Sequence, residues 1–256
     1  MKKRIIQAAA VLVFAAALIL PVKTAMEEQA PVLEPGQIYL YGEAHSEEVI
    51  LEEEFRLWNQ YYHVNGMRDL FIEAPYYQAE FMNIWMRQED DEILKMLYQN
   101  TEGTAGNSEY TWEFWKKIKK ECPETVFHGT DVGHQYWSTG PAYLQYLEDQ
   151  GQNDSEEYRR AVENMEQGER YYSKESGDSV YRENKMAENF REEYERLDGK
   201  SIMGIYGGAH VGIGDSDYDT GTVPNMASQL YQIYGGKLHP LDLSKEWELW
   251  FPDRKK

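Results

Sequence analysis

Cysteine is almost absent from this 256-residue sequence, which contains a single copy, Cys122. A lone cysteine cannot form a disulfide within the chain, and paired Cys-x-x-Cys metal or redox sites are excluded as well. Cys122 precedes Pro123 late in a predicted helix. That position is more typical of a structural thiol than of a reactive one.

Positive charge is scarce too. The chain has 26 lysine and arginine residues against 45 aspartate and glutamate residues, which gives a formal net charge of −19. So acidic a surface repels the phosphates of nucleic acids and the headgroups of anionic lipids. We therefore expect no nucleic-acid partner and no membrane contact except through the N-terminal segment. Small molecules or peptides that are neutral or basic fit this charge better as substrates.

Most of the common catalytic signatures are also missing. The sequence has no Gly-x-Ser-x-Gly elbow, no His-Glu-x-x-His pair, no phosphate-binding P-loop and no Gly-x-Gly-x-x-Gly dinucleotide motif. Hydrophobic residues nevertheless make up 41% of the chain, and 14% of it is aromatic, which is enough for a folded core. The length predicts a single domain.

The N-terminus has the composition of an export segment. Lys2-Lys3-Arg4 is followed by an apolar run from Ile5 to Val22. We predict that residues 1–25 are either a cleaved signal peptide or a retained membrane anchor, which makes the protein exported. Residues 26–36 read as a tether, and 37–256 as one domain.

Short apolar runs alternate with amphipathic segments along the rest of the chain, as in α/β proteins. The region between residues 46 and 66 shows this most clearly, because apolar side chains recur at spacings of 4, 3 and 4 from Leu51 to Tyr62. We expect Ser46 to cap this helix and Gly66 to end it. The strands on either side of it should then be parallel, which would place His45 and Glu73 side by side at their carboxyl ends.

The fold class predicted from this alternation is α/β, with a central, mostly parallel β-sheet flanked by helices. A long charged helical insertion at 154–197 precedes the last core strands, with a hinge near Gly177 and Asp178 as the cap of its second helix. The strands are expected at 37–41, 69–72, 125–129, 201–206 and 237–243.

Ionisable residues follow several of these apolar strands. Two Gly-x-x-His sequences, ending at His45 and His210, would place both imidazoles at the carboxyl edge of the sheet, where ligands collect in open α/β folds. Glu43, Glu73 and Asp131 have similar positions. Each alone could be an ordinary surface group, but a converging set could bind a divalent ion that activates water, or supply a general base directly.

Several short motifs occur in the order found in erythromycin esterase-type proteins, and the sequence resembles that family over nearly the whole predicted domain. The family belongs to a wider group with the Tiki/TraB proteases and the ChaN-type haem-binding lipoproteins, of which the paired Gly-x-x-His is the hallmark. The motifs are Gly42-Glu43-Ala44-His45, Phe71-Ile72-Glu73-Ala74-Pro75, Gly129-Thr130-Asp131, the segment from Arg182 to Asn189, Gly208-Ala209-His210-Val211 and Pro224-Asn225-Met226-Ala227.

The resemblance implies a mostly parallel sheet with a site at its carboxyl edge. It makes His45 the base that activates water, with Glu43, Glu73 and His210 completing the cleft. The Tiki branch instead implies that these four residues hold a divalent metal (Mn, Co or Zn). Arg182 is implied as an anion stabiliser, and Asn189 shares its helical face.

The chain departs from the esterase pattern in two places. It has one residue fewer before its first histidine, and Gly207 replaces the first histidine of a His-Asn-x-His motif. We therefore expect an exported hydrolase of ester or peptide bonds, with macrolides doubtful as its substrate. The alternative is a non-catalytic, ChaN-like surface protein that binds haem or metal, and a third reading is a degenerate family member that serves as a scaffold.

Overall fold

The computed structural model describes residues 34–245. The predicted signal peptide or anchor, 1–25, and most of the predicted tether lie outside the described residues. Within the described range no helix is long and apolar enough to cross a membrane.

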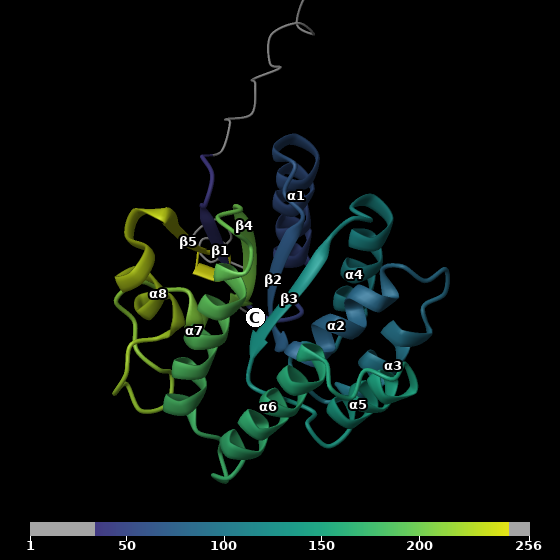
Figure 1. Cartoon of the computed structure of the whole chain (residues 1–256). Helices are drawn as coiled ribbons and strands as arrows, with labels where there is room; N and C mark the ends of the chain where they lie inside the picture. The colour runs from purple at the N-terminus through teal and green to yellow at the C-terminus, as the bar shows by residue number, and fades with distance from the viewer. Residues whose placement is uncertain (1–33, 246–256) are drawn as a thin grey trace, which may run out of the picture. The chain divides into compact units, whose positions relative to one another are not determined.

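Strands and helices alternate along the chain (Figure 1). The strands are β1 (Ile38–Glu43), β2 (Asp69–Pro75), β3 (Val126–Asp131), β4 (Ile202–Gly207) and β5 (Leu238–Asp242). The α-helices are α1 (Glu48–Asn65), α2 (Tyr76–Trp85), α3 (Glu92–Asn100), α4 (Glu109–Glu121), α5 (Thr139–Asp149), α6 (Glu156–Tyr171), α7 (Ser179–Glu195) and α8 (Met226–Tyr234). Two short 3₁₀ turns are η1 (Gly208–His210) and η2 (Gly235–Lys237).

The five strands form one sheet in the order β3-β2-β4-β1-β5, and every neighbouring pair is parallel. The predicted α/β fold with a parallel sheet is therefore confirmed. The two strands that carry the Gly-x-x-His sequences are direct neighbours, with Glu43 in register with Gly207. The strands β1 and β2, which flank α1, are parallel as predicted, and β4 lies between them.

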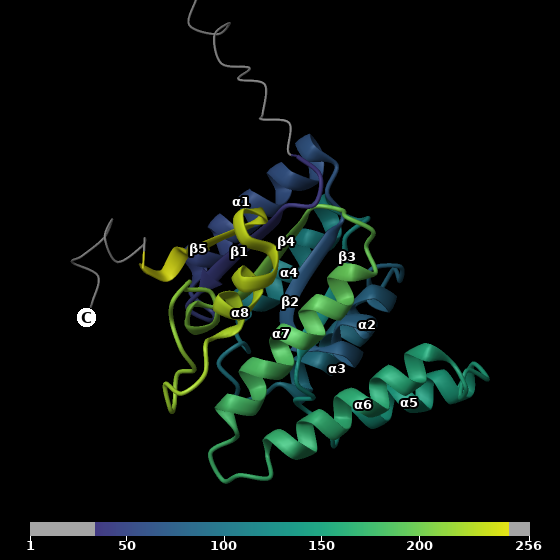
Figure 2. The ribbon, with the colours of Figure 1, turned by 60° about the vertical axis from the view of Figure 1, so that its left-hand side comes forward.

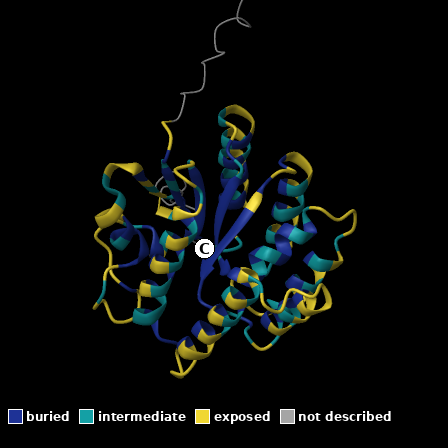
Figure 3. Cartoon of the chain, viewed as in Figure 1, coloured by how far each residue is buried: buried dark blue, intermediate teal, exposed yellow. Residues whose placement is uncertain are grey.

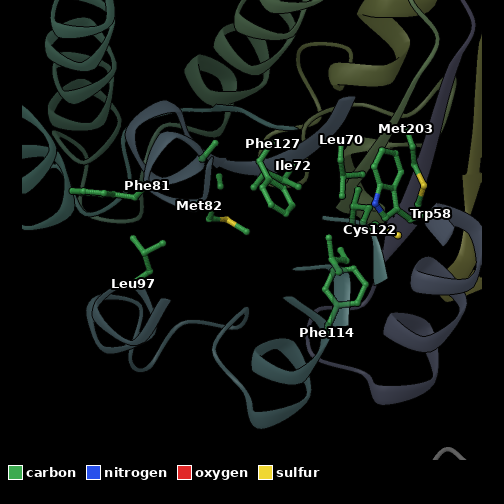
Figure 4. Packing of buried hydrophobic residues seen from close by; sticks show 14 of the residues in the cluster. Trp58, Leu70, Ile72, Phe81, Met82, Leu97, Phe114, Cys122, Phe127 and Met203 are labelled. Carbon is green, nitrogen blue, oxygen red and sulfur yellow. The ribbon is translucent and has the colours of Figure 1, made fainter. Parts of the chain in front are cut away.

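Both faces of the sheet are buried. Successive side chains of a strand point to opposite faces, so Leu70 and Ile72 of β2 join one apolar cluster while Phe71 joins the other. Helices α1 and α4 cover the first face, whereas α7 and α8 cover the second (Figures 1 and 2). Figure 3 shows the strands as mostly buried, and Figure 4 shows part of the first cluster, including Trp58 and Phe114.

The predicted charged insertion divides into two helices with different positions. Helix α7 is a layer of the core, because Met186 and Phe190 are buried against the sheet. Helix α6 packs mainly against other helices, namely α5, α2 and α7 (Figure 2). The predicted cap is confirmed, since the carboxylate of Asp178 accepts a hydrogen bond from the backbone N–H of Tyr181 at 3.2 Å.

The predicted start of α1 is wrong by one residue. Glu47 occupies the N-cap position, and Ser46 lies before it with a left-handed backbone, φ 65°. The hydroxyl of Ser46 donates instead to the carbonyl oxygen of Ala105 at 2.6 Å, which ties the end of β1 to the loop before α4. The predicted end is confirmed, because Gly66 is left-handed with φ 70°.

Candidate functional site

The first part of the site is a carboxylate–imidazole pair at the end of β1. Glu43 is the last residue of the strand, and its Oε1 accepts a hydrogen bond from Nδ1 of His45 at 2.6 Å. This contact fixes the ring and leaves Nε2 free to face the carboxylate of Glu73, 4.0 Å away. A separation of 4.0 Å exceeds a hydrogen bond, so Nε2 keeps its capacity to exchange a proton with another group.

Glu73, in β2, lies at the centre of the site. Its Oε1 accepts from Nη2 of Arg182 at 2.5 Å, and its Oε2 accepts from the backbone N–H of Gly207 at 2.5 Å. Glycine at 207 favours this approach. A Cβ there would lie 3.1 Å from Nε2 of His45 and 3.2 Å from Oε2 of Glu73. The Gly-Gly-Ala-His segment therefore lets β4 pass close beneath the two side chains.

A second carboxylate–imidazole pair lies behind Glu73. Nδ1 of His210 donates to Oε1 of Glu183 at 2.6 Å, and Nε2 of His210 is 3.6 Å from Oε1 of Glu73. The other oxygen of Glu183 accepts from the backbone N–H of Met226 at 2.7 Å, which joins α7 to the start of α8. His210 is 3% exposed and Glu183 is fully buried. His210 therefore reaches the site through Glu73.

Arg182 is held by two carboxylates. Asp131, at the end of β3, accepts from Nε of Arg182 at 3.0 Å and from Nη2 at 2.6 Å, while Glu73 shares Nη2. A guanidinium in a bidentate contact is fixed in orientation as well as position. Nη1 has no hydrogen-bond partner within residues 34–245, so one nitrogen stays available to a ligand.

Asn189 supports this arrangement from the next turns of α7. Its Nδ2 donates to the carbonyl oxygen of Thr130 at 3.2 Å and to Oε1 of Gln167 at 2.9 Å. It therefore anchors the end of β3 and does not enter the cavity.

A cavity of about 380 Å³ opens beside these residues. The volume falls in the range of small-molecule sites. Of the residues expected from the sequence, His45, Glu43, Glu73, Asp131 and Arg182 line it, whereas His210 and Asn189 lie behind its wall. Seven sequence-predicted residues are thus brought into one connected network, but only five of them face the cavity.

The electrostatics of the site favour charged imidazoles. The hydrogen bond with Glu43 raises the pKa of His45 to about 9, against the opposing effect of burial. Burial also disfavours a charge on His210, but Glu73 and Glu183 outweigh it and raise the pKa of that ring. For Glu73, burial favours the neutral acid, yet His210 and Arg182 hold its pKa below the ordinary value. In the resting site, negatively charged carboxylates therefore lie next to protonated imidazoles and the guanidinium of Arg182.

The same contacts decide whether these residues fit a divalent metal ion. Among residues 34–245, no group of three or more His, Cys, Asp or Glu side chains is placed to hold one. Both oxygens of Glu73 accept from N–H donors, and Nδ1 of each imidazole donates to its own carboxylate. In this arrangement the donors do not fit the Mn, Co or Zn ion that the resemblance implies. The catalytic chemistry that this arrangement supports is therefore that of the side chains themselves.

Three residues at or near the site were not expected from the sequence. Glu183 falls within the segment from Arg182 to Asn189 but has no role in the sequence-based prediction, and His134 belongs to none of the motifs. His134 lines the cavity, with Nε2 3.0 Å from Oδ2 of Asp131 and Nδ1 2.6 Å from the hydroxyl of Tyr172. Glu54 of α1 also lines the cavity. Its signal was visible, since a glutamate three residues after Leu51 falls on the apolar face of that helix.

Comparison with known proteins identifies the fold. No protein-family model matches the sequence, and no curated protein matches it. Erythromycin esterase EreC, as a histidine-to-asparagine variant in its open conformation, is similar with a TM-score of 0.57 and 10% identity, over 81% of this chain and 69% of that one.

Two further solved structures are similar. A Bacillus cereus protein has a TM-score of 0.51 and 12% identity, over 82% of this chain and 65% of its own. A succinoglycan biosynthesis protein has a TM-score of 0.51 and 13% identity, over 79% of this chain and 64% of its own. The chain thus spans about two thirds of the length of these relatives. The predicted resemblance to the erythromycin esterase-type group is confirmed in the fold.

Proposed function

We propose that this chain is a hydrolase in which His45 activates water for the cleavage of an ester or peptide bond. One observation carries the proposal. Nε2 of His45, supplied by β1, lies 4.0 Å from Oε1 of Glu73, supplied by β2, at the edge of a cavity of about 380 Å³. Pairs of ionisable groups whose surroundings oppose each other are typical of acid–base sites.

The neutral ring of His45 is the general base. As the oxygen of a water attacks the carbonyl carbon of the substrate, Nε2 takes one proton of that water and becomes an imidazolium, which the carboxylate of Glu43 stabilises. Glu73 accepts the water's other hydrogen and so orients it. The imidazolium then returns its proton to the departing alkoxide or amine as the C–O or C–N bond breaks.

Arg182 stabilises the charge that forms on the carbonyl oxygen. Its Nε and Nη2 are bound to Asp131 and Glu73, so the guanidinium is already oriented when the substrate arrives. Such preorganised donors contribute more to rate than donors that must first move. Nη1 is the nitrogen that we assign to the oxyanion. His210, held by Glu183, positions Glu73 from behind.

Export is part of this proposal, because the lysine-, arginine- and alanine-rich segment 1–25 has the composition of a signal peptide or anchor. The full chain expressed in a bacterial host should appear in the extracytoplasmic or membrane fraction. A truncation that begins at residue 26 should stay in the cytoplasm. Equal distribution of the two forms would contradict export.

The experiment that tests the hydrolase proposal is a screen of chromogenic esters and peptides with the wild-type chain and with His45→Ala. A general base contributes about 10²–10⁴-fold to rate, so His45→Ala should lose at least a hundredfold in kcat. His63→Ala, an exposed histidine of α1, is the matched control and should keep wild-type turnover.

Elemental analysis and haem titration on the same protein separate the alternatives. Turnover that needs a stoichiometric metal would favour the metal-dependent, Tiki-like version. A Soret band on haem titration, with no turnover of any substrate, would favour the ChaN-like binding protein. Turnover by His45→Ala within a factor of two of wild type would contradict the proposal.

A further inference from the structure

Glu54 is a buried carboxyl group without a partner. The residue is 0% exposed, and neither Oε1 nor Oε2 has a hydrogen bond within the described part of the chain. Most buried polar side chains in folded proteins are hydrogen-bonded, and each exception calls for an explanation, such as a functional role of that side chain. Every other carboxylate described above has at least one donor, so Glu54 stands apart from them.

Its position points to a ligand. Glu54 lines the same cavity as His45 and Glu73, on the wall that α1 contributes. The lining also contains apolar side chains, among them Leu51, one turn earlier in α1, and Leu97 of α3. A carboxyl group beside apolar side chains, with the reactive His45 at the edge of the same cavity, would allow the site to hold a substrate by two ends.

The charges of the lining favour a cationic end over an anionic one. Four carboxyl groups line the cavity, and no lysine does. The one arginine is already shared between Glu73 and Asp131, and the ring of His45 is paired with Glu43. The unpaired carboxyl group of Glu54 disfavours an anionic group of a ligand. An ammonium group would instead supply the hydrogen-bond donor that this carboxyl group lacks.

We propose that Glu54 is the specificity-determining residue of this site and binds the ammonium group of a substrate whose body is apolar. The inference rests on the proposed hydrolase function for the reaction itself, which takes place at His45. The substrate class is then an ester or amide of an amphiphilic amine. Burial and the neighbouring Glu43 raise the pKa of Glu54, and a bound ammonium would oppose that effect by stabilising the carboxylate.

Binding can be tested without turnover. The probes are 4-phenylbutylamine and 4-phenylbutan-1-ol, which differ only in an ammonium or a hydroxyl, titrated calorimetrically into the full chain. Hydrogen bonds to charged groups are strong enough that the amine should bind the wild type at least about tenfold more tightly than the alcohol. In Glu54→Gln and Glu54→Leu the two affinities should agree within about twofold. Glu52→Gln, an exposed position of the same helix, should retain the full preference.

Hydrolysis of 4-nitrophenyl 6-aminohexanoate and 4-nitrophenyl heptanoate separates the two proposals. If both esters are cleaved at the same kcat/KM, and Glu54→Gln changes neither rate, the inference about Glu54 is overturned while the hydrolase stands. If neither ester is cleaved but the amine preference depends on Glu54, the hydrolase proposal fails and the amine site stands. An amine preference that survives in both Glu54 variants overturns the inference in either case.

Discussion

The protonation state of His45 sets the rate in this account. Its pKa is raised to about 9 by the hydrogen bond with Glu43, so only about 1% of the ring is neutral at pH 7. The neutral ring is the base, and its fraction rises with pH. We predict that kcat/KM increases about tenfold per pH unit from pH 7 and levels off above about pH 9.

Glu43→Gln supplies the matched comparison. Replacing the carboxylate by an amide removes the largest cause of the raised pKa, so the midpoint of the profile should move down toward the ordinary histidine value of about 6.5. The plateau rate should fall as well, because the imidazolium formed during attack loses its partner. A midpoint that stays near pH 9 in this variant would show that Glu43 does not control His45.

The buried carboxyl group of Glu54 should lower the stability of the folded protein, although it is the group proposed to bind the ammonium. Its carboxyl group is buried without a hydrogen bond, and Leu at this position would match the apolar wall. We predict that Glu54→Leu raises the free energy of unfolding by about 1–3 kcal/mol, measured by urea denaturation. Glu52→Leu on the exposed side of α1 should change it by less than about 0.5 kcal/mol.

The increase in the free energy of unfolding caused by Glu54→Leu should itself depend on pH. The folded-state pKa of Glu54 is raised above the ordinary value, so the folded protein keeps its proton while the unfolded chain releases it. The contribution of Glu54 to the free energy of unfolding therefore becomes less favourable as pH rises above about 4.5, and Glu54→Leu escapes that loss. The gain should be larger at pH 8 than at pH 4.5. A gain that shrinks with rising pH would contradict the burial of an unpaired acid.

Among the elements, α6 sits unusually close to the segment after β3. A Cβ added at Gly168 would lie 1.9 Å from the carbonyl oxygen of Gly133, next to His134 of the cavity. Gly168→Ala must therefore push the helix away and should cost about 1–3 kcal/mol of stability, with reduced turnover. Gly236→Ala, where nothing lies within 4 Å, is the control and should change stability by less than about 0.5 kcal/mol. Equal stability of the two variants would contradict the close packing.

The elements themselves were largely predictable. Most strands appear as apolar runs, although β5 contains His239 and Pro240. The helix between β1 and β2 follows from its apolar spacing and from Gly66. The order of the strands was not predictable in full, because local patterns do not say that β4 enters between β1 and β2. The pairing of the two Gly-x-x-His strands came from their shared motif alone.

The site was predictable to the extent that its groups follow strands. Glu43, Glu73 and Asp131 belong to this class. Glu183 lies in a charged helix, where nothing local marks one glutamate among many as the partner of His210. Its role depends on how α7 packs on the sheet, which only the tertiary structure reveals.

For the whole molecule, the paired groups predict a stability optimum in mildly acidic solution. Asp131 and Glu73 have lowered pKa values, so their contribution is present above the ordinary carboxyl pKa and is lost as pH falls. His45 and His210 have raised pKa values, so their contribution to stability is complete below about pH 6.5 and is lost as pH rises. For His45 this loss is centred on about pH 9.

Urea unfolding between pH 3 and pH 9.5 checks this window. We expect the free energy of unfolding to be greatest between about pH 5 and 6.5 and to decline on both sides. A maximum near pH 9 would mean that the imidazoles are not held as cations in the folded protein.

The central claim, that His45 and Glu73 act on one water, is tested most directly by a double-mutant cycle in kcat/KM. His45→Asn and Glu73→Gln should each lower kcat/KM at least about a hundredfold. The kcat/KM of the double variant should lie within about tenfold of that of the less active single variant, because the effects of residues that act as a unit are not additive. Losses that multiply in the double variant would show that the two side chains act independently and would contradict the account.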